Sequence, residues 1–182
     1  MSKRKILLHA CCAPCAAPCC EKLLKENFDL TLFFSNSNIS PFSEYEKRRN
    51  ELERLAKLMG VPLEIDSYEH EDWLRAVAGL ENEFEKGPRC TECFKHNLRR
   101  ASEKAESLGI ESFSTTLTIS PHKDSTVIFK AASSYPCFIP FDFKKNNGFA
   151  RSIELSRQFG LYRQGYCGCE FSNSQQAFNK KN

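Results

Sequence analysis

The amino-acid sequence predicts a three-layer α/β fold with a mainly parallel sheet. Short apolar segments of strand length alternate with longer amphipathic segments along the 182 residues. This alternation indicates parallel strands that are joined by right-handed helical crossovers. Hydrophobic residues make up 41% of the chain and include 15 phenylalanines, enough for a core without metals or disulfides. We expect one domain over residues 1–182, because no repeat or low-complexity linker divides the chain.

Four segments are expected to form the strands. Each is a run of apolar or β-branched residues of strand length. The segments are residues 5–10, 28–34, 63–68 and the threonine-rich residues 110–119. Ligands bind beyond the carboxyl ends of parallel strands, so the residues that follow each strand are the first candidates for a functional site.

The expected helices lie between and after these strands. The clearest one starts at a predicted capping box, Ser43 to Glu46, and stops at Gly60. A long helix is expected over about residues 91–108, where apolar residues recur on one face. The other helices are expected after a loop at residues 11–20, at residues 72–80 around Trp73, from Ser120 and Pro121 onward, and at residues 149–159.

The ten cysteines are the most unusual feature of the composition. The basic start of the chain resembles a signal peptide, but the apolar run that follows is broken at His9 and is too short for one. No segment has the about 20 apolar residues of a membrane span. We therefore expect a cytoplasmic protein with no membrane partner. Thiols stay reduced there, and clustered cysteines more often hold metal or carry redox chemistry than form structural bridges.

The cysteines fall into three groups and three isolated positions. The groups are Cys11, Cys12 and Cys15; Cys90 and Cys93; and Cys167 and Cys169. The isolated positions are Cys19, Cys20 and Cys137. The first group replaces the glycines that a phosphate-binding loop would need after the first strand. The second group lies at the start of the long helix, where the helix dipole favours thiolates.

Three kinds of chemistry fit these groups. An iron–sulfur cluster accepts adjacent cysteines together with a Cys-x-x-Cys pair from a distant segment. Structural zinc fits less well, because its Cys-x-x-Cys pairs usually recur after about 15 to 20 residues. Thiol–disulfide chemistry without a metal is the third alternative. Cys167 and Cys169 would form a strained, easily reduced disulfide, or could equally bind a second iron.

Other polar residues give weaker indications. His9 is expected to be packed in the core. Lys123 lies in the polar sequence His122-Lys123-Asp124 at an expected helix start, and such residues are either solvated or supply acid–base groups. The segment from about residue 144 is basic. It contains Lys144, Lys145, Arg151, Arg157, Arg163, Lys180 and Lys181 against Glu154 and Glu170. Beside aromatic residues, such a segment is typical of a nucleic-acid-binding surface or of a solvated helix with a lysine-rich tail.

Several motifs occur in order along almost the whole chain. They are Leu7-Leu8-His9-Ala10-Cys11-Cys12-Ala13-Pro14-Cys15; Asn36-Ser37-Asn38-Ile39 with Pro41 and Ser43-Glu44-Tyr45-Glu46; Arg89-Cys90-Thr91-Glu92-Cys93-Phe94; Thr115-Thr116-Leu117 with Ile119-Ser120-Pro121; and Asn147-Gly148-Phe149 followed by residues 162–172. Together they resemble the QueH family of cobalamin-independent epoxyqueuosine reductases. This ordered set is much more specific than a lone Cys-x-x-Cys pair.

The resemblance implies a Rossmann-like fold of the HUP type. It also implies an oxidoreductase that removes the epoxide oxygen of epoxyqueuosine at the wobble position of the tRNAs for Tyr, His, Asp and Asn. The residues that it assigns to a 4Fe-4S cluster are Cys11, Cys12, Cys90 and Cys93. Cys167 and Cys169 would be a catalytic redox pair or would bind a second, mononuclear iron, for which Cys15 is an additional ligand.

Removal of the epoxide oxygen needs two electrons and two protons, and no side chain is a good one-electron donor. We therefore expect an external electron donor as a partner. The residues expected to bind the anticodon by phosphate contacts or stacking are Arg151, Arg157, Arg163, Tyr162 and Tyr166. Two alternatives remain open: an ATP-dependent iron–sulfur tRNA thiolase, which would need a Ser-Gly-Gly-type loop after the first strand, and a zinc-binding nucleic-acid module.

Overall fold

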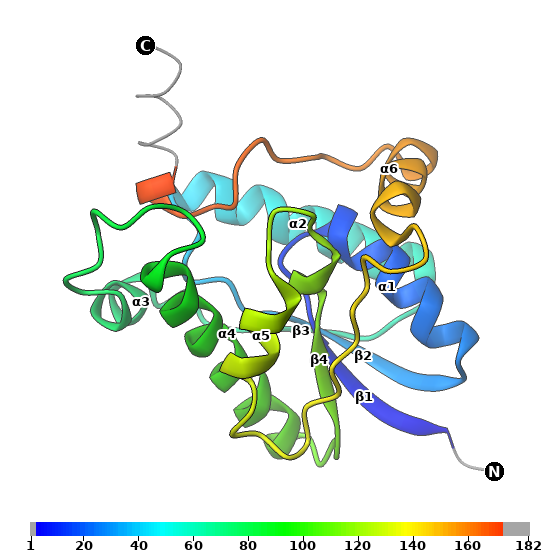
Figure 1. The fold of residues 1–182 in the computed structure, drawn as a ribbon. Helices are drawn as coiled ribbons and strands as arrows, with labels where there is room; N and C mark the ends of the chain where they lie inside the picture. Colours follow the sequence, from blue (N-terminus) through cyan, green and yellow to red (C-terminus); the bar gives the residue numbers. More distant parts are fainter. Residues whose placement is uncertain (1–2, 173–182) are drawn as a thin grey trace.

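The computed structural model describes residues 3–172, and these form a four-stranded sheet with helices on both faces (Figure 1). The strands are β1 (Arg4–His9), β2 (Phe28–Phe34), β3 (Leu63–Ile65) and β4 (Phe113–Thr115). All pairs are parallel, in the order β3-β2-β1-β4. The expected α/β class and parallel sheet are confirmed. Lys180 and Lys181 of the basic segment lie outside the described residues.

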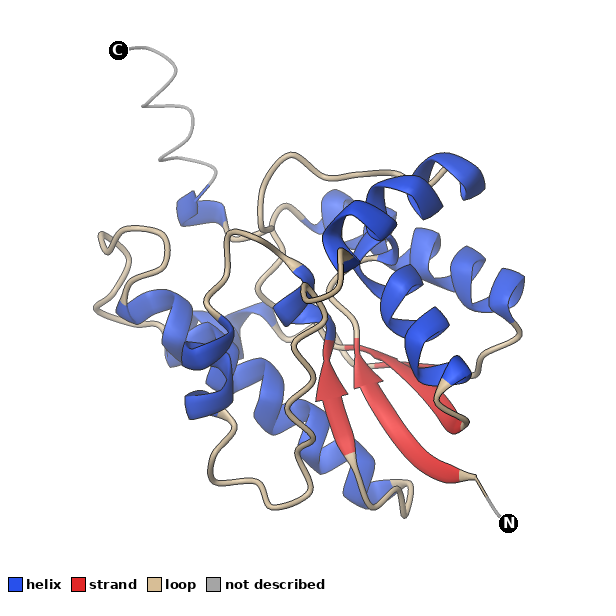
Figure 2. Ribbon diagram, turned by 45° about the vertical axis from the view of Figure 1, so that its right-hand side comes forward, coloured by secondary structure: helices blue, strands red, loops and turns tan. Residues whose placement is uncertain are grey.

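The helices pack in two layers, one on each face of the sheet (Figure 2). They are α1 (Ala13–Lys25), α2 (Phe42–Met59), α3 (His70–Ala76), α4 (Pro88–Ser107), α5 (Ser125–Ala131), α6 (Gly148–Phe159) and the 3-10 helix η1 (Thr116–Ile119). One layer contains α1, α2 and α6. The other contains α4 and α5, with α3 beside α4.

The alternation of side chains along the strands divides the core into two parts. Ile6 and Leu8 of β1 pack with α1 and α2 on one face. Leu7 and Phe33 pack with Leu98 of α4 on the other face. Both faces of β1 are therefore covered by helices, as the three-layer prediction requires.

Two helices begin earlier than the sequence predicted. Helix α1 starts at Ala13 rather than after a loop that ends at Cys20. Cys12 caps the helix, and Pro14 lies in its first turn, where a backbone N–H would have no hydrogen-bond partner within the helix. Helix α4 starts at Pro88, which occupies its first position; the N-cap Gly87 makes no side-chain hydrogen bond. As a result, Cys90 lies in the first turn of α4.

Two predicted helix caps are wrong. Ser43 does not open a capping box, since α2 already begins one residue before it and the N-cap Pro41 has no side-chain donor or acceptor. Ser120 does not start α5. Asp124 caps that helix instead, because its carboxylate accepts a hydrogen bond from the Thr126 N–H at 2.8 Å.

Two predicted strands are shorter than expected. The segment 63–68 is a strand only to Ile65. The segment 110–119 pairs with β1 over three residues and then turns into η1, because the Thr115 hydroxyl accepts a hydrogen bond from the Leu117 N–H at 3.2 Å. This turn brings η1 to the carboxyl edge of the sheet.

His9 joins the carboxyl ends of three strands. Its side chain is fully buried, with Nδ1 2.9 Å from the Thr115 hydroxyl and Nε2 2.9 Å from the Ser35 carbonyl. Burial lowers the pKa of His9, so the ring is neutral at neutral pH. The expectation of a packed core histidine is confirmed. No helix in the described part of the chain is long and apolar enough to span a membrane.

Candidate metal centre

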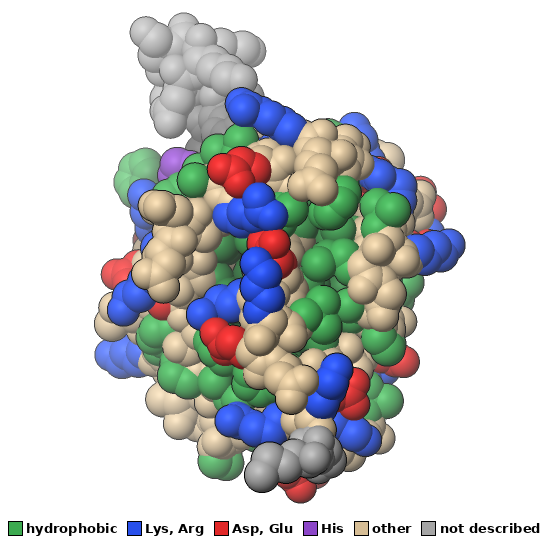
Figure 3. Space-filling model, turned by 90° about the vertical axis from the view of Figure 1, so that its right-hand side faces the viewer, with side chains coloured by type: hydrophobic (Ala, Val, Ile, Leu, Met, Phe, Trp, Pro, Cys, Tyr) green, Lys and Arg blue, Asp and Glu red, His purple; other side chains and the backbone are tan. Residues whose placement is uncertain are grey.

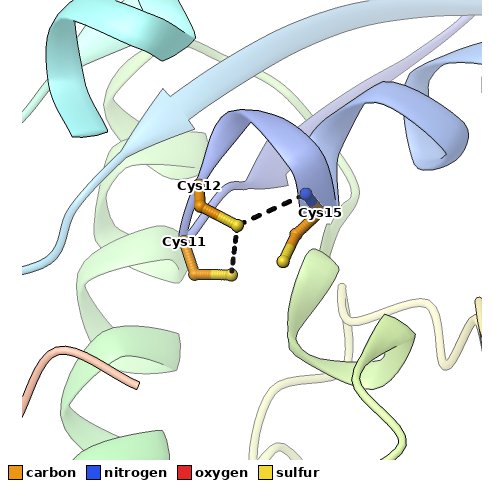
Figure 4. A group of neighbouring side chains, drawn as sticks. All are labelled: Cys11, Cys12 and Cys15. Atoms are coloured by element: carbon orange, nitrogen blue, oxygen red, sulfur yellow. Dashed lines mark hydrogen bonds between the residues drawn. The ribbon is translucent and has the colours of Figure 1, made fainter. Parts of the chain in front are cut away.

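The first cysteine group forms a compact set of thiols at the junction of β1 and α1 (Figure 4). The Sγ atoms of Cys11, Cys12 and Cys15 all lie within 4.8 Å of one another. Cys12 is the N-cap of α1, and its sulfur accepts a hydrogen bond from the Cys15 N–H at 3.3 Å. The start of α1 therefore stabilises negative charge on these sulfurs.

Thr116, in the η1 turn that follows β4, makes two hydrogen bonds with Cys11. Its hydroxyl accepts from the Cys11 N–H at 3.2 Å and donates to the Cys11 sulfur at 3.4 Å. Hydrogen bonds from the Cys12 and Cys15 thiols lower the pKa of Cys11 well below its ordinary value. Burial raises the pKa of Cys12, and the hydrogen bond to Cys11 raises that of Cys15. Without a metal, the negative charge of this group therefore resides on Cys11.

Cys90 and Cys93 lie in the first two turns of α4. Cys93 and Cys167 pack against the same small cluster around Trp73, while Cys90 and Cys11 contact the core beneath α4. The expectation that the helix start makes these thiols thiolates is wrong for the metal-free protein. Burial raises the pKa of Cys90, and it raises the pKa of Cys93 to about 12. Such thiols lose their proton when a metal ion replaces it.

Cys167 and Cys169 lie on a loop that is anchored to α2. Arg48 has only 1% of its surface exposed and donates to the carbonyls of Cys167 at 2.9 Å and Tyr166 at 3.1 Å. The Arg48 guanidinium also forms an ion pair with Glu44, with Nε 2.7 Å from Oε1. Because a buried guanidinium requires all of these partners, the loop is held in one place.

Gly168 allows the loop to approach the segment that follows β2. The Ser40 N–H donates to the Gly168 carbonyl at 2.9 Å. Gly168 has φ +118, and a Cβ atom there would lie 2.8 Å from Ile39 Cγ1 and 3.0 Å from Arg48 Nη1. Only glycine fits between the two cysteines.

The two thiols of this loop differ in acidity. A hydrogen bond from Cys169 lowers the pKa of Cys167 to about 6 against the opposing effect of burial, and Ser172 and Lys123 add to the lowering. The same hydrogen bond raises the pKa of Cys169, which is 5% exposed. In the reduced, metal-free protein Cys167 is therefore a thiolate at neutral pH.

We expect Cys167 to react well before Cys93 when the reduced, metal-free protein is treated with iodoacetamide. Its folded-state pKa is lowered, so the thiolate is present above about pH 6 and is lost as the pH falls through that value. Mass spectrometry of the peptides should show a rate with a midpoint near that pH, while Cys93 stays unmodified. A Cys167 rate that rises only above about pH 8 would contradict the assignment.

Lys123 lies among the cysteine groups, although the sequence indicated only a helix start there. Burial lowers the pKa of its ammonium, but the sulfurs around it outweigh that effect and the net shift is upward. The sulfurs that act on it belong to Cys11, Cys12, Cys15 and Cys167. The charge of Cys167 also acts on Cys90 and Cys93. Among the described residues, the close group of thiols consists of Cys11, Cys12 and Cys15, and Cys90, Cys93, Cys167 and Cys169 are outside it. Cys93 and Cys167, from two distant segments, lie within electrostatic range of Lys123.

The site contains residues that sequence reasoning did not identify. Arg48 could have been identified from the sequence, because it lies on the apolar face of α2 one turn before Leu52. A charged side chain on that face must be paired within the protein. Gln164 lies beside Cys12, and no sequence pattern indicates it. The isolated cysteines stay outside the three groups: Cys19 and Cys20 are buried in α1, and Cys137 lies beside Ser102.

Several residues expected to bind RNA have partners within the protein. Arg151 pairs with Glu21 at 2.9 Å. The Tyr162 hydroxyl donates to Glu44, and Arg163 donates to polar groups of α6. On the side of the molecule shown in Figure 3, basic side chains are interleaved with acidic ones. The basic segment therefore does not form a continuous positive surface there.

The groups around the thiols fit a thiolate-bound metal centre. Trp73 Nε1 and Ser172 Oγ are buried donors with no hydrogen-bond acceptor of standard geometry among the described residues. They lie within reach of the sulfurs of Cys93 and Cys167 respectively. Metal-bound thiolates accept hydrogen bonds from such donors. Soft sulfur ligands from three segments fit an iron–sulfur cluster.

Comparison with known families matches residues 6–175 to the family described as "Epoxyqueuosine reductase QueH". A protein of that name from Streptococcus pyogenes serotype M1 is 39% identical over 186 residues, which cover 96% of this chain and 72% of the relative. Its counterpart from Acinetobacter baylyi is 40% identical and covers 92% of this chain and 80% of the relative. The one from Thermotoga maritima is 35% identical, with coverages of 92% and 89%.

Among solved structures, the fold is similar to the U34-tRNA thiolase NcsA from Methanococcus maripaludis, which was solved with its 4Fe-4S cluster. The TM-score is 0.58 over 94% of this chain and 62% of the thiolase, at 11% identity. This chain thus spans less than two thirds of the thiolase. At such low identity the likeness concerns the fold alone, and it confirms the expected Rossmann-like architecture.

Proposed function

Because the chain belongs to the epoxyqueuosine reductase QueH family, we propose that it removes the epoxide oxygen of epoxyqueuosine and so gives queuosine. The protein is an oxidoreductase, as its relatives are. Each turnover consumes two electrons and two protons, and the oxygen leaves as water. The observation that carries the proposal is the match of residues 6–175 to this family, and the group of Cys11, Cys12 and Cys15 within electrostatic range of Lys123 supports it.

We assign the 4Fe-4S cluster to Cys11, Cys12, Cys90 and Cys93. When bound, such a cluster supplies single electrons at low potential, which side chains do not. Cys167 and Cys169 act as a redox-active pair, or together with Cys15 bind a second, mononuclear iron. Cys15 lies within 4.8 Å of Cys11 and Cys12, which places it beside two of the assigned cluster ligands.

The chain itself contributes protons and charge to the reaction. The Lys123 ammonium is surrounded by sulfurs that raise its pKa, so Nζ keeps its proton at neutral pH. An ammonium in that position neutralises the charge that develops on a leaving oxygen and can donate a proton to it. Within the Cys167 and Cys169 pair, hydrogen bonding keeps the proton on Cys169.

We propose that the substrate nucleoside is at the wobble position of the tRNAs for Tyr, His, Asp and Asn, and that electrons come from an external donor in the cytoplasm. The chain would act as one domain, with the segment from about residue 144 toward the tRNA. Arg157 is exposed on α6 and suits a phosphate contact. Arg151 and Arg163 would leave their partners within the protein to contact tRNA phosphates. Tyr162 would likewise leave Glu44 to stack on a base.

The function is tested by anaerobic purification followed by incubation with epoxyqueuosine-containing tRNA and a chemical reductant. We expect iron and acid-labile sulfide in the protein, and nucleoside mass spectrometry should show that epoxyqueuosine is replaced by queuosine. Persistence of epoxyqueuosine with a fully loaded cluster would reject the activity. Zinc without sulfide would reject the cluster.

A further inference from the structure

Trp73 is the one tryptophan of the chain and lies at the centre of a stack of rings. Its side chain is fully buried in α3. The His70 ring stacks on it at a centroid distance of 5.6 Å, and the Phe171 ring does so at 6.1 Å. His70 is itself held at both ring nitrogens, by the Ser37 carbonyl at 2.7 Å and by Glu170 at 2.8 Å. The orientation of the indole is therefore fixed.

The indole N–H of Trp73 has no acceptor of standard geometry among the described residues, although it is completely buried. A phenylalanine would supply an apolar aromatic ring, although a smaller one, without burying an unsatisfied donor. The acceptor within reach is the sulfur of Cys93, which packs against the Trp73 cluster from α4. A neutral thiol is a weak acceptor, whereas a metal-bound thiolate is a strong one.

We propose that Trp73 is a positioning residue that donates its indole N–H to the Cys93 thiolate and thereby raises the reduction potential of the cluster. The inference rests on the proposed function, because it takes Cys93 as a cluster ligand. Reduction adds negative charge to the cluster and its sulfurs. A hydrogen bond to a ligand sulfur stabilises the reduced state more than the oxidised state. Cys93 is thus both held in place and made a better ligand for the reduced cluster.

The test compares reconstituted wild-type protein with Trp73→Phe, which keeps an aromatic side chain, smaller than the indole, and removes the N–H. The matched control is Phe171→Leu, which changes packing against the same indole and removes no donor. In redox titrations followed by electron paramagnetic resonance, we expect the ratio of reduced to oxidised cluster at a fixed potential to fall about tenfold in Trp73→Phe, or about 59 mV for a one-electron couple. The control should stay close to the wild type. Equal potentials for wild type and Trp73→Phe, with equal iron and sulfide contents, would overturn the inference.

A second measurement does not depend on any variant folding. Because Trp73 is the sole tryptophan, fluorescence of the wild-type protein excited at the indole band reports on this residue alone. We expect its emission to be quenched in step with cluster loading. Full loading without a change in emission would also overturn the inference, and would leave the proposed function intact. Failure of the wild-type protein to bind a cluster would instead overturn the ligand assignment itself.

Discussion

The Cys12→Ala variant is expected to lose its cluster and with it all measurable reduction of epoxyqueuosine. Cys12 is 1% exposed, lies at the N-cap of α1 and shares its sulfur environment with Cys11 and Cys15. The group found among the described residues contains no His, Asp or Glu that could take its place as a ligand. Iron and sulfide per chain, and the paramagnetic resonance of the dithionite-reduced protein, measure the loss directly.

The same substitution also removes a helix cap, which costs about 1 kcal/mol of stability. Cys12→Ser separates the two effects, because a hydroxyl can accept the hydrogen bond from the Cys15 N–H but is a poor ligand for iron. We expect Cys12→Ser to melt near the wild-type temperature and still lack the cluster. Cys137→Ala, which removes a thiol outside the three groups, should keep full iron content. A complete cluster in either Cys12 variant would contradict the ligand assignment.

The Gly168→Ala variant is expected to keep its cluster and lose about 100-fold in kcat/KM, which is the typical effect of displacing a reacting group by about 1 Å. Alanine is strained at φ +118, and its Cβ would lie 2.8 Å from Ile39 Cγ1. The loop must therefore move away from Ile39 and Arg48, and Cys167 moves with it. Steady-state assays at matched iron content, with a thermal melt to show that the chain is folded, measure the effect.

Gly165→Ala is the matched control for this prediction. It lies in the same loop, three residues earlier, and a Cβ atom added there meets nothing within 4 Å. Its backbone is also outside the left-handed region. We expect wild-type kcat/KM from Gly165→Ala. Equal activity of the two alanine variants would mean that the position of Cys167 is not required for turnover.

Much of the fold could be predicted because its cause is local. The boundaries of β2 were predicted from its apolar run, and the ends of α2 and α6 from Gly60 and Gly160, which both adopt the left-handed conformation at a helix end. The errors arose where a residue's local role depends on a neighbour. A serine can cap a helix, but Pro41 and Asp124 took that place in α2 and α5.

The candidate site was predictable as a set of cysteines but not as an arrangement. Motif spacing identified the three groups, and parallel topology implied that segments after strands meet at one edge. Spacing placed Cys15 in one group with Cys11 and Cys12, but it could not show that the three sulfurs lie within 4.8 Å of one another, since this depends on α1 starting at Ala13. It also could not place Lys123 among the thiols. The helix-dipole argument failed for Cys93 because burial outweighs a dipole at that depth.

The anchoring of the last loop by Arg48 has a consequence for biosynthesis. A chain still on the ribosome exposes Cys11 and Cys12 long before residues 166–169 are made, and until then Arg48 has no carbonyl partners for its guanidinium. The four assigned cluster ligands, Cys11, Cys12, Cys90 and Cys93, all precede that loop in the chain, so Cys167 and Cys169 are the last thiols to join the site. The position of these two thiols therefore depends on the prior folding of α2, which supplies Arg48 as the anchor of their loop.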